Sequence, residues 1–306
     1  MKALKKAVVA LAGLAAFSIP SLADVPSGEE FAKKFIISVD GAHNLLGKPD
    51  VRDLLDGDSP KRFMEKHVPG AVNAFAHDLH YLADIRKCGL PMCPERAAKF
   101  IGEELGIDNN THVIAYDDGK GPNASGVWFF LYLYGLTMSR MMDGGLATWE
   151  AKGYPVESGE GKKTAPKKFT PKIRKEIIAT KEEVLRAIKD KDHYFILDAR
   201  RFQEYTGKTL LDALEKPGKH ITVKRGGHIP GAVFAEWKKF AGNPSGKPNK
   251  HLFKKMKKLK KVYKKLKKKG LTPDKTVITY CHVGLGRGSF VFAALKLLGH
   301  KMLKFM

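Results

Sequence analysis

The sequence predicts an α/β protein made of two tandem copies of one domain, each with a parallel sheet flanked by helices. Short β-branched runs alternate with segments of helical periodicity along the chain, which is typical of parallel sheets. The motif HVPGAV at 67–72 returns as HIPGAV at 228–233, and the segments 116–135 and 280–299 have the same length. Because both repeats keep this order, the 306 residues divide into about two domains.

The first 23 residues have the features of a secretory signal peptide. Three lysines precede an apolar core at 7–19 that is too short to cross a bilayer, and SLA at 21–23 is a small-x-small cleavage site. We therefore expect an exported protein, periplasmic or secreted. Removal of the peptide lowers the formal charge from +23 to +20 (23 − 3), and a charge of this size favours anionic ligands.

The first domain is expected at 24–158. Its expected elements are a strand and a short helix at 31–47, strands at 51–56, 112–116 and 138–142, helices at 94–105 and 127–134, and a closing helix after Asp143. Residues 159–176 are rich in Lys, Gly and Pro and lack an apolar period, so they are expected to form a linker.

The second domain is expected at 177–306, with strands at 177–179, 195–198 and 277–280. Thr180 and Glu183 form a capping box that opens a helix ending at Ile188. A further apolar helix is expected at 290–298. The sequence stops opposite Met142, where the first copy continues into its closing helix, so this domain is expected to be truncated and unstable as it stands.

The strand at 276–280 delivers Cys281 into a glycine-rich loop, 282–286, that leads directly into a helix. Loop N–H groups and the positive end of a helix stabilise a thiolate, which is the reactive form of cysteine. Gly284 and Gly286 permit the close approach and positive φ that such a loop needs. The pattern predicts a nucleophile or a sulfur carrier at Cys281.

The equal length of the two loops aligns the copies without gaps. Three residues of the second copy then stand opposite residues of different chemistry in the first: Cys281 opposite Asp117, Arg287 opposite Asn123, and Arg200 opposite Asp58. The first copy therefore lacks both a nucleophile and the cations that would hold an anion. We predict that the second domain is catalytic and that the first is an inactive copy.

The sequence contains several motifs in a fixed order: LDAR, then EY, then GHIPGA, then a strand that leads through a cysteine and a loop into a helix. In the order of these motifs it resembles the two-domain rhodanese (thiosulfate sulfurtransferase) family over nearly the whole mature chain. The resemblance implies two rhodanese domains with sheets of about five strands each, a site between the domains, and activity only at the C-terminal cysteine. It implies a sulfurtransferase that moves a sulfane sulfur from thiosulfate, or a similar donor, to a thiophilic acceptor through a persulfide on Cys281. The acceptor would be cyanide, a thiol or an acceptor protein.

The same resemblance makes Arg200 the substrate arginine. The candidate substrate-binding residues are therefore Arg200, His282, Val283, Gly284, Leu285, Gly286 and Arg287. No cofactor or metal is expected. Thiosulfate is favoured over 3-mercaptopyruvate, because the mercaptopyruvate enzymes carry a CGSGVT-like loop, whereas His and Val follow the cysteine here.

Cys281, five residues and Arg287 also satisfy Cys-x5-Arg, the loop signature of cysteine-based phosphatases and related arsenate reductases on the same fold. Against this hypothesis, Tyr280 replaces the histidine that usually precedes the phosphatase cysteine, and no general-acid Asp follows the loop. Phosphatase-like chemistry stays open beside sulfur transfer.

Cys88 and Cys93 lie close together in CGLPMC. In an oxidising compartment they can form a disulfide; two unbonded thiols are the alternative, and the sequence leaves both open. Metal binding is disfavoured because no second ligand pair has the spacing of a zinc site.

Twelve lysines fall between 250 and 269. Apolar residues recur among them at helical spacing: Leu252, Met256, Leu259, Tyr263 and Leu266. We expect an amphipathic helix with one packed face and one basic face. The basic face suits steering of anions, or docking of a sulfur-carrier module on an acidic protein or a membrane surface. Nucleic acid is not an expected partner, and a monomer is expected.

Overall fold

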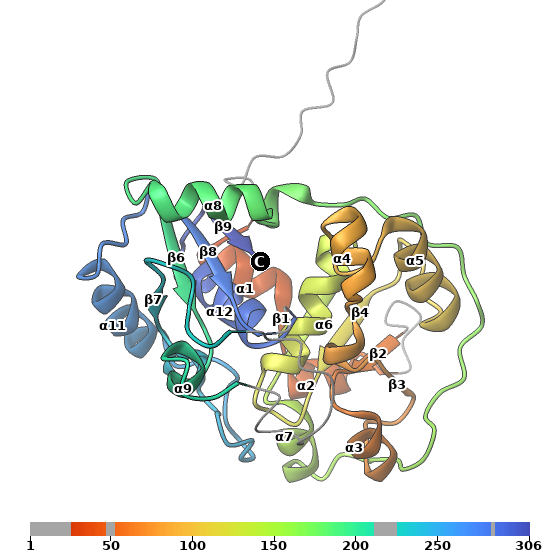
Figure 1. Cartoon of the computed structure of the whole chain (residues 1–306). Coiled ribbons are helices and arrows are strands. Elements are labelled where there is room, and N and C mark those ends of the chain that lie inside the picture. The colour runs from red at the N-terminus through yellow and green to blue at the C-terminus, as the bar shows by residue number, and fades with distance from the viewer. Residues whose placement is uncertain (1–25, 47–52, 211–224, 283–284) are drawn as a thin grey trace, which may run out of the picture.

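The computed structural model describes residues 26–46, 53–210, 225–282 and 285–306, which form two similar domains (Figure 1). The expected signal peptide at 1–23 lies outside these ranges, as do Val283 and Gly284 of the cysteine loop. None of the helices in the described ranges is long and apolar enough to cross a membrane.

The first domain contains a parallel sheet of five strands in the order β1-β5-β4-β2-β3. The strands are β1 (Ile36–Ser38), β2 (Asp53–Asp56), β3 (Ala71–Asn73), β4 (Val113–Tyr116) and β5 (Ser139–Asp143). All neighbouring strands run parallel. Because Asp56 pairs with Tyr116, the carboxyl ends of β2 and β4 are level, and the loops that follow them meet at one edge of the sheet.

Helices cover both faces of this sheet. They are α1 (Gly28–Phe35), α2 (Val39–His43), α3 (Pro60–Glu65), η2 (Ala76–Asp78), α4 (Leu82–Cys88), α5 (Pro94–Lys99), η3 (Phe100–Glu104), α6 (Pro122–Leu133) and α7 (Gly145–Ala151). The sequence prediction missed α1. Phe31 and Phe35 lie one helical turn apart, are fully buried, and meet the indole of Trp128 edge-on.

The second domain has a parallel sheet of four strands in the order β7-β6-β8-β9. Its elements are η4 (Lys175–Ile177), α8 (Lys181–Lys189), β6 (Tyr194–Asp198), α9 (Phe202–Tyr205), β7 (Val233–Phe234), η5 (Trp237–Lys239), α11 (Met256–Lys267), β8 (Thr276–Tyr280), α12 (Arg287–Leu297) and β9 (Leu303–Phe305). The predicted fold class, two tandem α/β domains with parallel sheets, is confirmed.

The start of the second domain differs from its prediction in one respect. The expected strand at 177–179 is reduced to a single bridge between Ile178 and Phe305, at the place where the first domain has the β1–β5 pairing. The predicted helix start is confirmed, because the Thr180 hydroxyl accepts a hydrogen bond of 3.2 Å from the Glu183 N–H.

The lysine-rich helix is shorter than the predicted segment 250–269, because α11 begins only at Met256. Leu252 and Phe253 are instead held beside residues 240–242: the Gly242 N–H donates to the Leu252 carbonyl at 2.8 Å. Leu252 is buried as predicted, but in an extended segment. Met256 is 41% exposed and is not part of the packed face.

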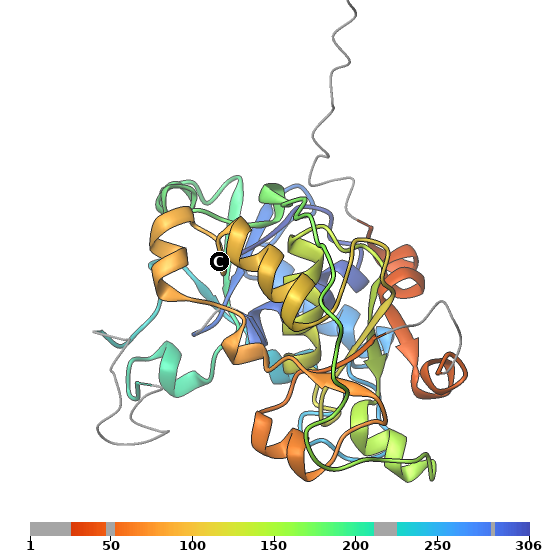
Figure 2. The same cartoon turned by 90° about the vertical axis from the view of Figure 1, so that its right-hand side faces the viewer.

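The linker is fastened to the first domain along its length. It runs over the outside of that domain in both views (Figure 1, Figure 2). Backbone N–H groups of the linker donate to the first domain at several places: Lys162 to Ala71, Lys167 to Gly102, Lys172 to Tyr134 and Arg174 to Leu133, at 2.8–3.0 Å. The segment that was expected to form a linker therefore packs on the first domain as an added layer.

Helices α6 and α12 pack against each other between the two sheets (Figure 1). They occupy equivalent positions in the repeat, and almost every residue of both is buried. The equivalent hydroxyl oxygens of Ser125 and Ser289 lie 3.4 Å apart, and the Phe129 and Phe292 rings meet edge to face at 5.2 Å. One apolar core therefore spans both domains, with the two repeats related about this helix pair.

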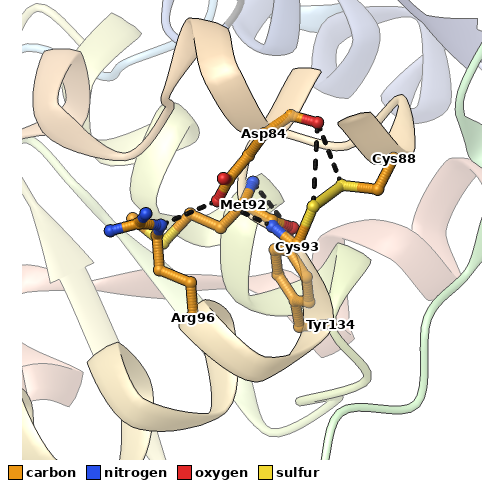
Figure 3. Close-up of a disulfide and its surroundings, with 6 residues drawn as sticks. All are labelled: Asp84, Cys88, Met92, Cys93, Arg96 and Tyr134. Atoms are coloured by element: carbon orange, nitrogen blue, oxygen red, sulfur yellow. Dashed lines mark hydrogen bonds and ion pairs between the residues drawn. A yellow bond between two sulfur atoms is a disulfide. The ribbon is translucent and has the colours of Figure 1, made fainter. Parts of the chain in front are cut away.

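The structure contains a disulfide between Cys88 and Cys93, which joins the end of α4 to the start of α5 (Figure 3). Asp84 supports it: its carboxylate accepts hydrogen bonds from the Cys93 N–H at 2.9 Å and from Nε of Arg96 at 2.8 Å. Of the two alternatives that the sequence left open, the structure has the disulfide.

Candidate active site

Cys281 lies between the end of β8 and the start of α12, and is only 8% exposed. Gly286 closes the loop with a φ of +142°, a region that favours glycine. Its N–H donates to the Ser289 hydroxyl oxygen at 3.0 Å, which caps the helix. The thiol therefore sits directly before a helix N-terminus, as the sequence predicted.

The equivalent loop of the first domain shows what this backbone shape binds. The buried carboxylate of Asp117 occupies the position that corresponds to the cysteine. It accepts five hydrogen bonds of 2.8–3.2 Å from backbone N–H groups of its own loop: Gly119, Gly121 (to both oxygens), Asn123 and Ala124. A strand-loop-helix of this length therefore makes a cradle for a negative charge.

The second loop aligns with the first without gaps, but α12 begins at Arg287, one residue later than the position that corresponds to Pro122, the start of α6. Among its described residues, the N–H groups of Leu285, Arg287 and Gly288 correspond to three of the donors around Asp117. A Cβ added to Gly288 would lie 3.2 Å from the Cys281 nitrogen, so the helix start and the cysteine are in close contact. A thiolate at Cys281 lies where the first copy holds a carboxylate.

Arg287 is held by Glu204 rather than pointing away from the protein. Its Nη1 and Nη2 donate to the two carboxylate oxygens at 2.7 and 3.2 Å, and Glu204 is 2% exposed. Burial lowers the pKa of the Arg287 guanidinium, but the hydrogen bond to Glu204 and then the charge of Cys281 raise it. The pKa therefore lies above its ordinary value. Arg287 thus lies in the electrostatic field of Cys281, and Glu204 neutralises much of its charge.

Arg200 is tied into a second network at the end of β6. Its Nε and Nη2 donate to the buried carboxylate of Asp198, and Nη2 also donates to the Gly227 carbonyl at 2.6 Å. The Tyr280 hydroxyl donates to the same carboxylate at 2.6 Å and accepts from the Ile229 N–H at 3.3 Å. This network joins the strand before Cys281 to the HIPGA turn.

The first domain keeps the tyrosine of this network and replaces the arginine. Tyr116 accepts from the Val68 N–H at 3.0 Å, as Tyr280 accepts from Ile229. Asp58 stands where Arg200 stands and accepts from Nδ2 of Asn123 at 2.8 Å. Burial, together with the charges of Asp58 and Asp118, raises the pKa of the Asp117 carboxyl, although its N–H donors act in the opposite direction. The first loop is filled by its own acid and surrounded by others, so it cannot accept an anion.

The first domain contributes to the surroundings of the cysteine loop. Gly126 of α6 lies against it: an added Cβ would be 3.2 Å from the Gly286 nitrogen and 3.0 Å from the Ala76 Cβ. At the equivalent place beside the first loop, the ring of Phe290 packs closely on Gly121. A glycine therefore faces the cysteine loop, whereas a phenylalanine fills the space beside the first loop.

His80 is a second contribution of the first domain. Its Nδ1 is buried and has no hydrogen-bond partner in the described part of the chain. Burial lowers the pKa of His80, and the charges of His77 and of His282 lower it further. Since His282 belongs to the cysteine loop, His80 lies near that loop.

The sequence predicted Cys281, Arg287 and Arg200 as site residues, and the structure brings three further residues to their surroundings: Glu204, Gly126 and His80. The EY motif contained a signal for Glu204, because an acid one helical turn after the LDAR strand is positioned to meet a loop cation. Gly126 and His80 come from the other repeat, and a linear motif does not reveal contacts between domains. Val283 and Gly284 lie outside the described residues.

Comparison with known proteins agrees with this architecture. The sequence matches the family described as the rhodanese-like domain over residues 38–152 and again over 180–306. A relative from Mycobacterium tuberculosis, provisionally named a thiosulfate sulfurtransferase, is 28% identical over 274 residues, which cover 88% of this chain and 90% of the relative. Thiosulfate/3-mercaptopyruvate sulfurtransferase 2 of Arabidopsis thaliana is 30% identical over 228 residues, covering 64% of this chain and 63% of that protein.

Solved structures share the fold. SseA from Escherichia coli, described as a 3-mercaptopyruvate sulfotransferase, superimposes with a TM-score of 0.68 at 22% identity, over 89% of this chain and 97% of SseA. Tum1 from Saccharomyces cerevisiae gives 0.69 at 15% identity, over 89% of this chain and 91% of Tum1. At these identities the likeness concerns the fold alone. The family match to both halves, together with the duplicated loop geometry, shows that this chain belongs to the rhodanese-like domain family and carries two copies of the domain.

Proposed function

We propose that this protein is a sulfurtransferase in which Cys281 carries the transferred sulfur as a persulfide. The observation that carries the proposal is the anion cradle around Asp117, with Cys281 at the corresponding position of the second loop. A persulfide is anionic and needs N–H donors, but no strong base. The relatives named as thiosulfate sulfurtransferases support the same reaction.

The reaction balances without an external oxidant or reductant. The Cys281 thiolate attacks the sulfane sulfur of thiosulfate, a new S–S bond forms, and the old S–S bond breaks so that sulfite leaves with the electron pair. The acceptor then attacks the outer sulfur of the persulfide. The thiolate is released and stays in the cradle. Cyanide would leave as thiocyanate in this second step, and a thiol would leave as its persulfide.

The charges near Cys281 suit a small anion. The helix N-terminus and the loop N–H groups supply partial positive charge without a competing nucleophile. The helix dipole alone contributes about 0.3–1 kcal/mol at an exposed site, so the converging N–H groups contribute the larger share. Arg287 adds a guanidinium that Glu204 keeps in place.

Thiosulfate is the donor that we propose, with 3-mercaptopyruvate as the second choice. His282 follows the cysteine directly, and Arg200 is engaged by Asp198 and the Gly227 carbonyl, which leaves fewer of its donors for a substrate carboxylate. The Arabidopsis relative is named for both donors. Comparing the two donors in the same assay separates these alternatives.

The proposal is tested by intact mass. The protein is incubated with thiosulfate, desalted without reductant, and weighed; we expect a gain of one sulfur atom that cyanide removes. Cys281→Ser should abolish the gain. If the gain is absent, or if it survives in the serine variant, the proposed function is wrong.

The Cys-x5-Arg spacing requires one further measurement on the same samples. A phosphatase should hydrolyse an aryl phosphate and bind vanadate through Arg287. The Glu204 carboxylate already engages Nη1 and Nη2 of that arginine and offsets its charge, so we expect neither activity. Hydrolysis of the aryl phosphate without persulfide formation would replace sulfur transfer by phosphatase chemistry.

We also propose that residues 1–23 direct export to an oxidising compartment. The Cys88–Cys93 disulfide supports this, because disulfides persist mainly outside the reducing cytosol. The expected result is a mature protein that begins at Asp24, measured by N-terminal sequencing of protein from the exported fraction. An intact N-terminus in that fraction would contradict cleavage.

A further inference from the structure

The exposed face of α11 carries a concentration of charge that the sulfur-transfer site does not use. Ten lysines between 255 and 269 are exposed: Lys255, Lys257, Lys258, Lys260, Lys261, Lys264, Lys265, Lys267, Lys268 and Lys269. We call these ten residues the lysine face. Figure 1 shows α11 at the outer edge of the second domain, on the side away from the first.

The lysine face lacks compensating charge. In the described part of the chain, none of these ten lysines forms an ion pair with a carboxylate. From residue 237 to residue 273 the sequence contains fifteen lysines, no arginine and no acid. No acid stands in the first turn of α11 either, where one would favour the helix. The lysines therefore repel one another, both along the helix at i,i+4 spacing and towards Lys239 and Lys254.

The orientation of the helix is fixed by its other face. Leu259 and Leu266 are 1% and 3% exposed and pack in the core, with Val262 and Tyr263 half-buried beside them. Because these apolar side chains pack inside the protein, α11 has no apolar face left for contact with a partner. Lys257, Lys261, Lys264 and Lys268 lie opposite the buried leucines by helical geometry and point furthest from the core.

We propose that the lysine face binds the surface of an anionic lipid bilayer by electrostatic attraction, without insertion. Each lysine near such a surface adds attraction, and the effect accumulates over a row of them. The use of lysine alone favours this partner. Lysine is a mobile point charge that suits a diffuse layer of headgroups, whereas arginine and aromatic residues dominate specific protein interfaces and base-stacking surfaces.

The experiment measures co-sedimentation with vesicles of the protein that begins at Asp24, the proposed mature form. Vesicles of phosphatidylcholine alone are compared with vesicles containing about one third phosphatidylglycerol, at about 0.1 M and about 1 M salt. We expect binding to the anionic vesicles at low salt, loss of that binding at high salt, and none to phosphatidylcholine. Every variant begins at Asp24, so the apolar segment 7–19 cannot bind the vesicles in place of α11.

Three matched variants assign the binding to α11. Exchange of Lys257, Lys261, Lys264 and Lys268 for Gln should weaken vesicle binding at least about tenfold, and exchange of the same four for Arg should preserve it. The control variant exchanges four exposed lysines of the first domain for Gln: Lys33, Lys61, Lys87 and Lys99. It removes the same charge and should weaken vesicle binding less than about threefold. Thermal unfolding checks each variant, and the Lys261→Gln/Lys264→Gln pair replaces the fourfold Gln variant if that one does not fold.

The proposal is overturned if the α11 and first-domain Gln variants lose binding equally, or if phosphatidylcholine vesicles bind as well as anionic ones. It is also overturned if poly-glutamate or duplex DNA, at equal charge concentration, binds more tightly than the vesicles, since an acidic macromolecule would then be the better partner. Persulfide formation on Cys281 is measured without lipid in all variants and should not change, so failure of the lipid proposal leaves sulfur transfer intact.

Discussion

At the scale of single residues, Glu204 controls how much positive charge Arg287 presents beside Cys281. The two side chains form a paired, largely buried contact, with Arg287 16% and Glu204 2% exposed. The carboxylate fixes the guanidinium in place and at the same time weakens its field at the thiolate. The pair therefore leaves the backbone N–H groups as the main donors of the loop, with only partial help from the arginine.

Replacement of Glu204 by Gln tests this role. The amide keeps the size of the side chain but leaves the guanidinium uncompensated, so we expect a loss of about 3 kcal/mol in the free energy of unfolding. In the protein that remains folded, inhibition of sulfur transfer by sulfate should strengthen several-fold. Urea denaturation and inhibition curves measure the two effects.

The control for this prediction is Glu236→Gln, which removes the carboxylate of an ion pair with a half-exposed lysine in the same domain. That change should alter stability by less than about 1 kcal/mol and leave sulfate inhibition unchanged. If Glu204→Gln weakens sulfate inhibition, then Glu204 positions Arg287 for the anion and does not restrain its charge.

At the scale of elements, strand β8 positions Cys281 through the tyrosine that precedes it. The Tyr280 hydroxyl joins the Asp198 carboxylate to the Ile229 N–H of the HIPGA turn, and burial followed by the Asp198 charge raises its pKa far above the ordinary range. Tyr280 is therefore a neutral hydrogen-bonding bridge. The phosphatase histidine that it replaces would offer no phenol for this bridge.

Tyr280→Phe should lower the free energy of unfolding by about 1–3 kcal/mol, since it leaves a buried carboxylate with one donor fewer. Tyr116→Phe removes the equivalent bridge of the first domain and should cost a similar amount. Only Tyr280→Phe should also slow the proposed persulfide formation, because only β8 leads to Cys281. Equal rates in the two variants would show that the bridge supports the fold without aligning the loop.

The disulfide belongs to the same scale, because it joins helices α4 and α5 across a short loop. The exchange of Cys88 and Cys93 for Ser releases a loop closed by residues five apart, and chain entropy predicts a loss of about 2 kcal/mol. Persulfide formation should be unchanged, because the variant leaves Cys281, the proposed sulfur carrier, in place. A decrease in sulfur transfer under matched folding conditions would instead link α4 to the active site.

The sequence was sufficient for the elements whose pattern repeats. HxPGA, the strand before each loop and the equal lengths of 116–135 and 280–299 located Cys281, and alignment of the copies identified Asp117 as its counterpart.

The sequence-based predictions were wrong where tertiary contacts determine local structure. The residues before α11 pair with 240–242 instead of joining the helix, and Ile178 makes one bridge instead of a strand. Helix α1 was missed because its apolar residues anchor it to α6 of the same domain through Trp128.

At the scale of the whole molecule, the first domain contacts the cysteine loop because α6 and α12 share one core. Ser125 contacts the cysteine loop directly, with its hydroxyl donating to the Gly286 carbonyl at 3.2 Å. Gly126 stands next to it with no side chain between α6 and the loop. Such contacts depend on how two repeats meet, and the sequence of one repeat does not contain that information.

Gly126→Val tests whether the first domain keeps the cysteine loop open. The new side chain must meet the Gly286 nitrogen, the Leu285 carbonyl carbon and the Ala76 Cβ, all within 3.0–3.3 Å of the added Cβ. It would press on the loop as Phe290 presses on the first one. We expect persulfide formation to fall at least about tenfold, with a loss of about 1–3 kcal/mol in stability from overpacking. Rapid-quench mass analysis and urea denaturation measure these effects.

Gly102→Ala is the matched control, because Gly102 is another helical glycine of the first domain in closer contact with its surroundings. An added Cβ there clashes with the Lys167 carbonyl of the linker, far along the chain from the cysteine loop. This variant should lose stability but keep the rate of persulfide formation in its folded fraction. If Gly102→Ala slows sulfur transfer as much as Gly126→Val does, the effect is general loosening of the first domain. If only Gly126→Val is slow, the first repeat acts at the site through the space that one glycine leaves open.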